Sequence, residues 1–312
     1  MIKSILFVGS EVSPFAATGG LGDVLGSLPE AIKAEDGSID VRVVSPLYSR
    51  ISAEWRDKMT FIRWIMVRVA WRNEYCGIYS LEKGGVTYYF LDNEKYFSRP
   101  ALYGDFDDGE RFAFFSFAAV ELMDAVGFYP DVLHANDWQS AGSVIKLKSA
   151  YKNDERYKNI KAVYTIHNMD YQGTFDMDIY DDVFGFLWEI RPALEFDWKI
   201  NLAKGAIEFA DKVTTVSPRY AEEILEEPSA HGLSSIMRRN SSKLRGIING
   251  IDYSVYDPEN DGDIPCRFSA DDLSGKAECK AELRRRFGLE DSNAPIIAMV
   301  SRLAEQIGRA HV

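Results

Sequence analysis

The sequence predicts an α/β fold built on a doubly wound, Rossmann-like parallel sheet. Three observations predict it: 46% hydrophobic against 27% charged residues over 312 positions, apolar runs that alternate with helical patterns, and a glycine-rich turn after the first run. Such alternation implies parallel strands joined by crossover helices on both faces of the sheet. The expected strands cover residues 4–8, 41–45, 86–91, 132–135, 162–167, 213–216, 244–248 and 296–300. The expected helices cover residues 22–33, 110–126, 140–151, 199–209, 218–225 and 275–287.

The first strand runs directly into the loop 11–24, which contains Gly19 and Gly20. Apolar residues recur at helical spacing after the two glycines, so a helix is expected there with Asp23 in its first turn. The N–H groups and the dipole of a helix N-terminus favour an anion, and paired glycines let a phosphate approach the backbone. The pattern therefore predicts an anion site, with an ordinary strand-to-helix turn as the alternative.

The domain organisation follows from changes in pattern along the chain. Residues 55–79 alternate as a strand does and are expected to form a hairpin insertion. A first domain is expected over 1–253, followed by a linker with a short helix over 254–295, because that stretch opens with acidic, Pro- and Gly-rich sequence. Residues 296–306 are expected to supply the first strand of a second domain. Residues 307–312 match what a common short-read sequencing adapter encodes in one frame, and we expect them to be foreign to the protein.

Composition narrows the classes of partner. A net charge of −12 argues against a nucleic-acid partner, which needs a basic surface. No apolar stretch is long enough to span a membrane and no signal-peptide pattern precedes the first strand, so we expect a cytoplasmic protein without a membrane partner. Cys76, Cys266 and Cys279 form no CxxC pair and the four histidines are scattered, so we expect neither a metal site nor a disulfide.

Polar clusters follow five of the expected strands. They cover residues 134–139, 165–173, 214–218, 248–252 and 301–303. In α/β sheets, ligands bind at the carboxyl ends of the strands. A single cluster is usually a set of helix caps, and Asp137 and Ser217 each fit that role. Five clusters at one edge, together with the glycine loop, favour a phosphorylated or polyhydroxyl ligand.

Several segments resemble the bacterial glycogen synthases and plant starch synthases. The matching segments include TGGLGDV at 18–24, YFSRPALYGD at 96–105 and HANDW at 134–138. The others are 111–116, 165–173, 212–220, 246–252 and 301–303; all occur in the family's order and reach Gln306. The resemblance implies a retaining glucosyltransferase with two Rossmann domains, the GT-B type, which transfers glucose from ADP-glucose to the non-reducing end of an α-1,4-glucan. It also implies catalysis without a metal or other cofactor.

The resemblance further implies roles for individual residues. Asp137 and His167 would be catalytic: Asp137 would hold a sugar or acceptor hydroxyl, and His167 would lie against the transferred glucose with its carbonyl near the anomeric centre. The implied substrate-binding residues are Ala17, Thr18, Gly19, Gly20, Tyr96, Asn249 and Arg302. The glycines would offer N–H groups to the donor, Tyr96 and Asn249 would line the cleft, and Arg302 would pair with the diphosphate. Without the resemblance, His167 fits a core histidine, Tyr96 a packing residue and Asn249 a turn.

The chain departs from the family at two points. Ala17 stands where the family has a lysine, and the loss of that charge would cost roughly 1.5–3 kcal/mol of donor binding. After Gln306 the family continues into its second domain, whereas this sequence continues with Ile307. We therefore expect negligible synthase activity from this chain alone.

Other functions stay open at this point. A non-catalytic glucan-binding protein, or a degenerate paralogue, would bind through Trp138, Tyr96 and neighbouring aromatic residues. The N-terminal motifs argue against a relative of the phosphorylases or sucrose synthases. A dinucleotide dehydrogenase is disfavoured because no G-x-G-x-x-G follows the first strand.

Overall fold

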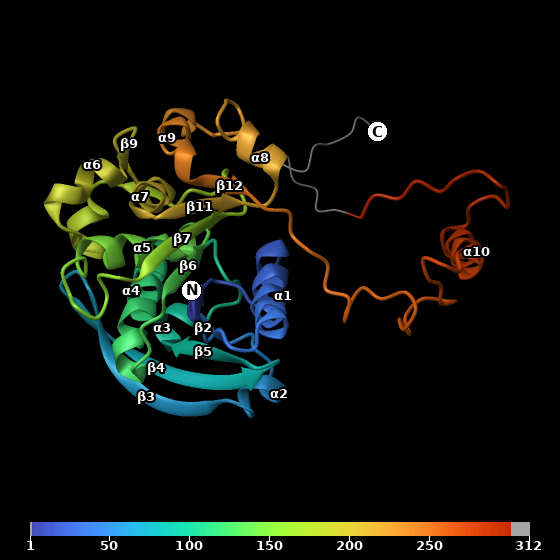
Figure 1. Ribbon diagram of the computed structural model, residues 1–312, viewed down its shortest axis with the longest axis horizontal. Helices are drawn as coiled ribbons and strands as arrows, with labels where there is room; N and C mark the ends of the chain where they lie inside the picture. The colour runs from blue at the N-terminus through green and yellow to red at the C-terminus, as the bar shows by residue number, and fades with distance from the viewer. Residues whose placement is uncertain (1, 301–312) are drawn as a thin grey trace. The chain divides into compact units, whose positions relative to one another are not determined.

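The computed structural model describes residues 2–300, and a nine-stranded sheet lies within its N-terminal part (Figure 1). Its strands are β1 (Ser4–Val8), β2 (Asp40–Pro46), β3 (Thr60–Val69), β4 (Arg72–Lys83), β5 (Val86–Asp92), β6 (Val132–Asn136), β7 (Lys161–Ile166), β11 (Lys212–Thr215) and β12 (Leu244–Gly246). They lie in the order β12-β11-β7-β6-β1-β2-β5-β4-β3, and all neighbours from β12 to β5 are parallel. The predicted α/β class and the Rossmann-like sheet are confirmed.

The order of the strands reverses at β1. The chain passes from β1 to β2 and β5 on one side, then returns to place β6 against the other side of β1. This point of reversal, between β1 and β6, is where doubly wound sheets open a crevice at the carboxyl ends of their strands. Leu6, Phe7 and Val8 of β1 are buried, as expected for a central strand covered on both faces.

Helices cover both faces of the sheet. Figure 1 shows α1 (Gly20–Glu35) on one side and α4 (Asp108–Val126) with α5 (Trp138–Ser149) on the other. The helix α4 is apolar around most of its circumference, as expected for a helix that is buried between α5 and the strands β2 to β5 of the sheet. The remaining helices of this part are α2 (Ala53–Arg56), α3 (Glu94–Phe97), α6 (Arg191–Leu194), α7 (Leu202–Phe209), α8 (Pro218–Glu223) and α9 (Ser234–Arg239), with single turns η1 (Tyr180–Phe184), η2 (Trp188–Ile190) and η3 (Ser241–Lys243).

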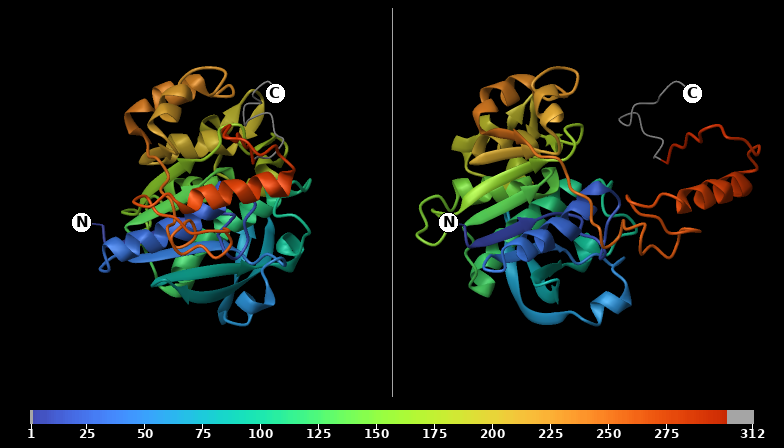
Figure 2. Two further views of the ribbon diagram at one scale, coloured as in Figure 1. Left: turned by 90° about the vertical axis from the view of Figure 1, so that its right-hand side faces the viewer. Right: turned by 45° about the vertical axis from the view of Figure 1, so that its right-hand side comes forward.

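The expected hairpin is present as β3 and β4, which pair antiparallel. It is more than an insertion, because β4 also pairs antiparallel with β5 and so extends the main sheet to the edge strand β3. Figure 2 shows these two strands, in blue and cyan, as the strongly curved end of the sheet. The prediction identified the hairpin but not its attachment, since strand alternation carries no information about the neighbour.

The predicted helix at 199–209 begins too early. Residues Lys199–Asn201 form β10, which pairs with β8 (Thr174–Asp176) and β9 (Glu195–Phe196) in a separate three-stranded sheet. The helix α7 starts at Leu202 because the Asn201 side chain caps it by accepting a hydrogen bond from the Lys204 N–H at 2.9 Å.

The chain divides into two units between Gly250 and Ile251. The described part of the second unit contains one helix, α10 (Gly275–Phe287), which was predicted with these bounds and ends at Gly288 in the left-handed conformation (φ 61°). The strand predicted at 296–300 is not formed, because a strand needs a hydrogen-bonded neighbour and none is present in the described part of this unit. Residues 301–306 and the expected foreign segment 307–312 lie outside the described residues.

Within residues 2–300, no helix combines the length and the apolar character that a membrane crossing requires.

Candidate active site

The candidate site lies where β1, β6 and β7 end next to one another. The register pairs Val8 with Ala135 across β1 and β6, and Asn136 with Thr165 across β6 and β7. The glycine loop therefore begins beside the turn at Asp137, and both lie beside the residues that follow Ile166. Of the predicted site residues, the topology brings together the glycine loop, Asp137 and His167.

Asp137 holds the backbone that follows β7. One carboxylate oxygen accepts the N–H of His167 at 2.8 Å, and the carboxylate also accepts the N–H of Asn168. Asp137 precedes α5, yet its side chain makes no capping bond, so the N-cap alternative fails for this residue. It holds for Ser217, whose Oγ accepts the N–H of Tyr220 at 2.9 Å at the start of α8.

The turn at Asp137 is strained and its carboxylate is turned inward. The backbone φ is 56°, a conformation in which a residue with a Cβ is uncommon outside turns and functional sites. Burial raises the pKa of the carboxyl group, although the His167 ring and the two backbone N–H groups act to lower it.

His167 is half-buried at the end of β7, which does not fit the alternative of a core histidine. Its ring Nε2 lies 3.0 Å from Oδ1 of Asn136, a residue that is 1% exposed. Sequence reasoning included Asn136 in a family motif but gave it no role. Asn136 of β6 thus binds the ring of His167, while the carboxylate of Asp137 binds its backbone N–H.

The neighbouring His134 has a structural role. Its Nε2 lies 2.6 Å from Oγ1 of Thr165, which in turn lies 2.6 Å from Oγ1 of Thr214 on β11. Its ring packs on Phe7 at 4.8 Å between centroids. Burial lowers the pKa of His134 to about 3, and electrostatic repulsion from the His167 ring acts in the same direction. The His134 ring is therefore neutral at physiological pH.

The glycine loop is closed by Glu11, which sequence reasoning missed. Its buried carboxylate accepts the N–H of Thr18, the N–H of Gly19 at 3.2 Å and the Thr18 hydroxyl at 3.0 Å. The Thr18 hydroxyl also contacts the hydroxyl of Tyr103 at 2.5 Å. Thr18 and Gly19 were expected to face a ligand, but their backbone N–H groups face the carboxylate of Glu11. Gly20 opens α1, where helix geometry leaves the first N–H groups without an intrahelical acceptor.

Ala17 lies next to this carboxylate and is exposed. A Cβ placed on Gly22 would lie 2.3 Å from the Cβ of Ala17 and 3.5 Å from Oε2 of Glu11, so any side chain at 17 starts close to that charge. Burial raises the pKa of Glu11 against the hydrogen bonds from Thr18 and Gly19, and the charge of Asp137 raises it further. The signal that could have found Glu11 is a lone carboxylate between a buried strand and paired glycines.

Two aromatic residues differ from expectation. Tyr96 is 0% exposed: its ring packs on Phe97 and Phe114, and its hydroxyl binds Glu110. The structure thus supports the packing role rather than a place lining a cleft. Trp138 is also buried, so neither ring offers a face to a glucan, as the binding-protein alternative had assumed.

Two predicted site residues, Asn249 and Arg302, remain. Asn249 is exposed beyond the end of β12, in irregular backbone. Arg302 lies outside the described residues. Among residues 2–300, no cluster of three or more His, Cys, Asp and Glu side chains has a metal-binding arrangement.

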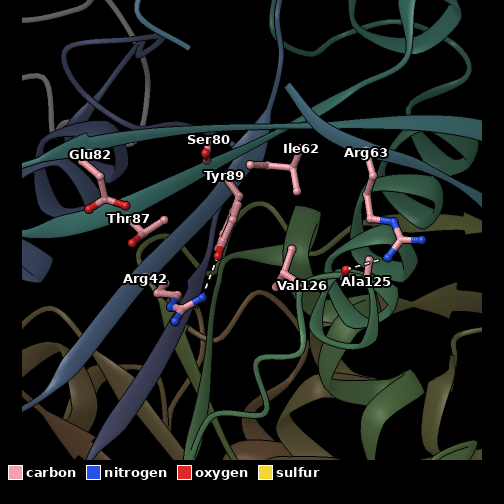
Figure 3. Close-up of a pocket in the computed structure, with 9 residues that line it drawn as sticks. All are labelled: Arg42, Ile62, Arg63, Ser80, Glu82, Thr87, Tyr89, Ala125 and Val126. Carbon is pink, nitrogen blue, oxygen red and sulfur yellow. Dashed lines mark hydrogen bonds between the residues drawn. The ribbon is translucent and has the colours of Figure 1, made fainter. Parts of the chain in front are cut away.

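An open cavity of about 750 Å³ lies over one face of the strands β2, β5, β4 and β3 (Figure 3). It is lined near the amino ends of β2 and β5 by Arg42 and Thr87, and by the last residues of α4. Figure 3 shows Arg42 bound to the Tyr89 hydroxyl and Arg63 bound to the carbonyl of Ala125. No described residue of the predicted site lines this cavity, so it is separate from the site at the carboxyl edge.

Comparison with known proteins gives a consistent result. A family model described as the starch synthase catalytic domain matches residues 4–239. Glycogen synthases of Lactococcus lactis, Clostridium beijerinckii and Ligilactobacillus salivarius are 46%, 45% and 44% identical over 308, 308 and 307 residues. Each alignment covers 97% of this chain, which spans 64% of the length of each relative. The catalytic domain of starch synthase IV from Arabidopsis thaliana, solved with ADP and acarbose, matches with a TM-score of 0.82 at 30% identity, over 94% of this chain and 60% of that one.

Proposed function

Because the chain belongs to the starch synthase catalytic domain family, we propose that it supplies the acceptor-side part of a glycogen synthase. The enzyme would be a hexosyltransferase that moves glucose, with retention, from ADP-glucose to the non-reducing end of an α-1,4-glucan. The observation that carries this proposal is the family match over residues 4–239, supported by relatives named glycogen synthase. Residues 1–253 would form the acceptor-side domain, 254–295 a linker with its helix, and 296–306 the start of the nucleotide-binding domain.

Transfer of glucose requires that the charges developing at two places be stabilised. As glucose leaves the diphosphate, positive charge develops at the anomeric carbon and negative charge on the departing group, so dipoles fixed beforehand at both places lower the barrier. Asp137 would contribute by holding the backbone of residues 167 and 168, through the hydrogen bonds described above. The carbonyl of His167 would then be held in place toward the anomeric centre.

The diphosphate would be bound from the other side of the crevice. The start of α1 at Gly20 offers N–H groups and the positive end of a helix dipole. Since Glu11 already accepts the N–H groups of Thr18 and Gly19, these two would shape the loop rather than bind the donor. With Ala17 in place of the family lysine, Arg302 would carry more of the electrostatic attraction to the diphosphate.

The test is a chimera, because we expect negligible turnover from this chain alone. Residues 1–306 replace the matching N-terminal part of the Lactococcus lactis glycogen synthase, and release of ADP from ADP-glucose is measured with glycogen as acceptor. Glycogen-dependent release of ADP is the expected result, and the Asp137→Ala variant of the chimera, which lacks the acceptor for the backbone N–H groups of His167 and Asn168, should lose it. A folded chimera that releases no ADP would contradict the proposal.

A second candidate is a glucan-binding protein that does not turn over donor, and Ala17 is the observation that favours it. The matched variant is Ala17→Lys in the same chimera. If the Ala17 chimera binds glycogen without releasing ADP and Ala17→Lys restores release, the second candidate is correct. If both release ADP, differing only in donor affinity, the first is correct.

A further inference from the structure

We propose that Asn136 is a positioning residue, which holds His167 in the tautomer protonated at Nε2 and so leaves Nδ1 as a hydrogen-bond acceptor for a hydroxyl of the bound sugar. The tautomer follows from contacts within the chain, whereas the sugar as ligand rests on the proposed function.

The orientation of the Asn136 amide is fixed by two carbonyl groups. Its Nδ2 donates to the carbonyl of His134 at 3.1 Å and to the carbonyl of Val8 at 3.4 Å. An amide NH₂ has two hydrogens to donate and its oxygen can only accept. The reversed orientation would bring Oδ1 against two carbonyl oxygens and lose both bonds. Oδ1 therefore faces the ring of His167.

That orientation decides which ring nitrogen carries the proton. Oδ1 lies 3.0 Å from Nε2 of His167, within hydrogen-bond distance, so Nε2 must be the donor. A neutral imidazole has one N–H, which leaves Nδ1 with a lone pair. In free imidazole the two tautomers interconvert, whereas here one of them is selected by a buried partner.

The Asn136 side chain can hold the ring because the backbone of Asn136 is itself held by hydrogen bonds. The Asn136 N–H donates to Oγ of Ser140 at 2.6 Å, and the same hydroxyl lies 2.7 Å from the Asn136 carbonyl. Through Val8 the amide also binds the end of β1, immediately before the glycine loop. One side chain thus connects the ends of β1, β6 and β7, and the ring is fixed relative to the loop that would receive the donor.

Because the chain has only four histidines, histidine-selective spectra contain few signals and the tautomer of His167 can be observed directly. Histidine-selective ¹⁵N labelling and long-range ¹H–¹⁵N correlation spectra at pH 8 distinguish a protonated from an unprotonated ring nitrogen, and His167→Gln assigns the signals. We expect Nε2 of His167 to be protonated and Nδ1 unprotonated, with a slowly exchanging Nε2 proton. A protonated Nδ1 would overturn the proposal at once, in the unmodified chain and without any substrate.

Two variants separate selection of the tautomer from packing. Asn136→Ala removes the acceptor and should cause loss of the Nε2 proton signal through fast exchange. Asn201→Ala, at another 1% exposed asparagine, is the matched control: it should lower the melting temperature and leave the His167 signals unchanged. An Asn136→Ala protein with an unchanged His167 spectrum would refute the role of Asn136. An inactive chimera would refute the proposed function while leaving this result standing.

Discussion

Asp137 provides the sharpest test of how the site is held together. Replacing it with alanine leaves the N–H groups of His167 and Asn168 without their acceptor. A buried donor without a partner costs about 1–3 kcal/mol, and because His167 and Asn168 are half-buried, the cost for each lies toward the lower end. The uncommon backbone conformation, φ 56°, adds little to this difference, because aspartate and alanine both carry a Cβ. Because removal of a carboxylate with a raised pKa returns part of the loss, we expect Asp137→Ala to lower the free energy of unfolding by about 1–3 kcal/mol.

Asp137→Asn should behave differently. The amide oxygen still accepts from the backbone, and asparagine tolerates a positive φ, so the net change at neutral pH should stay within about 1 kcal/mol. The pKa of Asp137 is raised in the folded state, so the native protein loses stability as pH rises from the unfolded pKa, about 3.9, through the folded pKa. The asparagine variant lacks this loss. Its stability relative to the native protein should therefore improve between pH 4 and pH 8.

The assay is urea denaturation followed by tryptophan fluorescence. All six tryptophans lie between Trp55 and Trp198, so the signal reports the first unit alone. Asp131→Ala is the control, because Asp131 also accepts two backbone N–H groups, from Lys3 and Ser4, but at an exposed position where water can replace it. An Asp137→Ala protein as stable as the native chain, or no more destabilised than Asp131→Ala, would refute this account of the turn.

Three further predictions follow from the same geometry. Ala17→Lys should tighten binding of ADP-glucose to the chimera by roughly 10- to 100-fold, measured by calorimetry, because about 1.5–3 kcal/mol of charge-assisted bonding is added; unchanged affinity would show that position 17 does not reach the donor. Glu11→Gln should raise the urea midpoint at pH 8 but not at pH 4, since the raised pKa of Glu11 penalises only its charged form; a lowered midpoint at pH 8 would contradict the assigned burial. Gly173→Ala should destabilise the first unit by about 2 kcal/mol or more, because φ is 65° and the new Cβ would lie 2.6 Å from Cε3 of Trp138; a stability within 0.5 kcal/mol of the native chain, on the order of a surface substitution, would contradict this.

Sequence reasoning succeeded where the signal was local. The run before Val8, the glycines that open α1 and the helix at 275–287 were predicted because hydrophobic periodicity and turn chemistry are read within one segment. It failed where the answer depended on a partner far along the chain. Tyr96 was placed in a cleft because its burial against Glu110 and Phe114 cannot be read from its own segment.

The same limit applies to the site. Asp137 and His167 were both predicted as site residues, but the contact between them is a hydrogen bond between residues 30 positions apart, which their own segments do not reveal. Glu11 was missed although its partners are only seven and eight residues away, because a carboxylate after a strand has many uses and only the folded loop selects one. The strand predicted at 296–300 shows the converse, since an apolar run forms a strand only when a neighbour is present to pair with it.

The charges at this edge give a reason to expect that the change at position 17 affects more than one contact. Glu11 and Asp137 are close enough for the charge of one to raise the pKa of the other, so two carboxylates already lie beside the loop that would receive a diphosphate. In a family member the lysine at 17 would begin next to Glu11 and compensate one of these charges before any ligand arrives. Here, with Ala17, the Glu11 carboxylate accepts the backbone N–H groups of Thr18 and Gly19, and in the proposed function these groups would not be available to the donor. If the chain binds the donor as proposed, the cost of Ala17 would include the loss of a partner for Glu11 as well as the loss of a contact with phosphate.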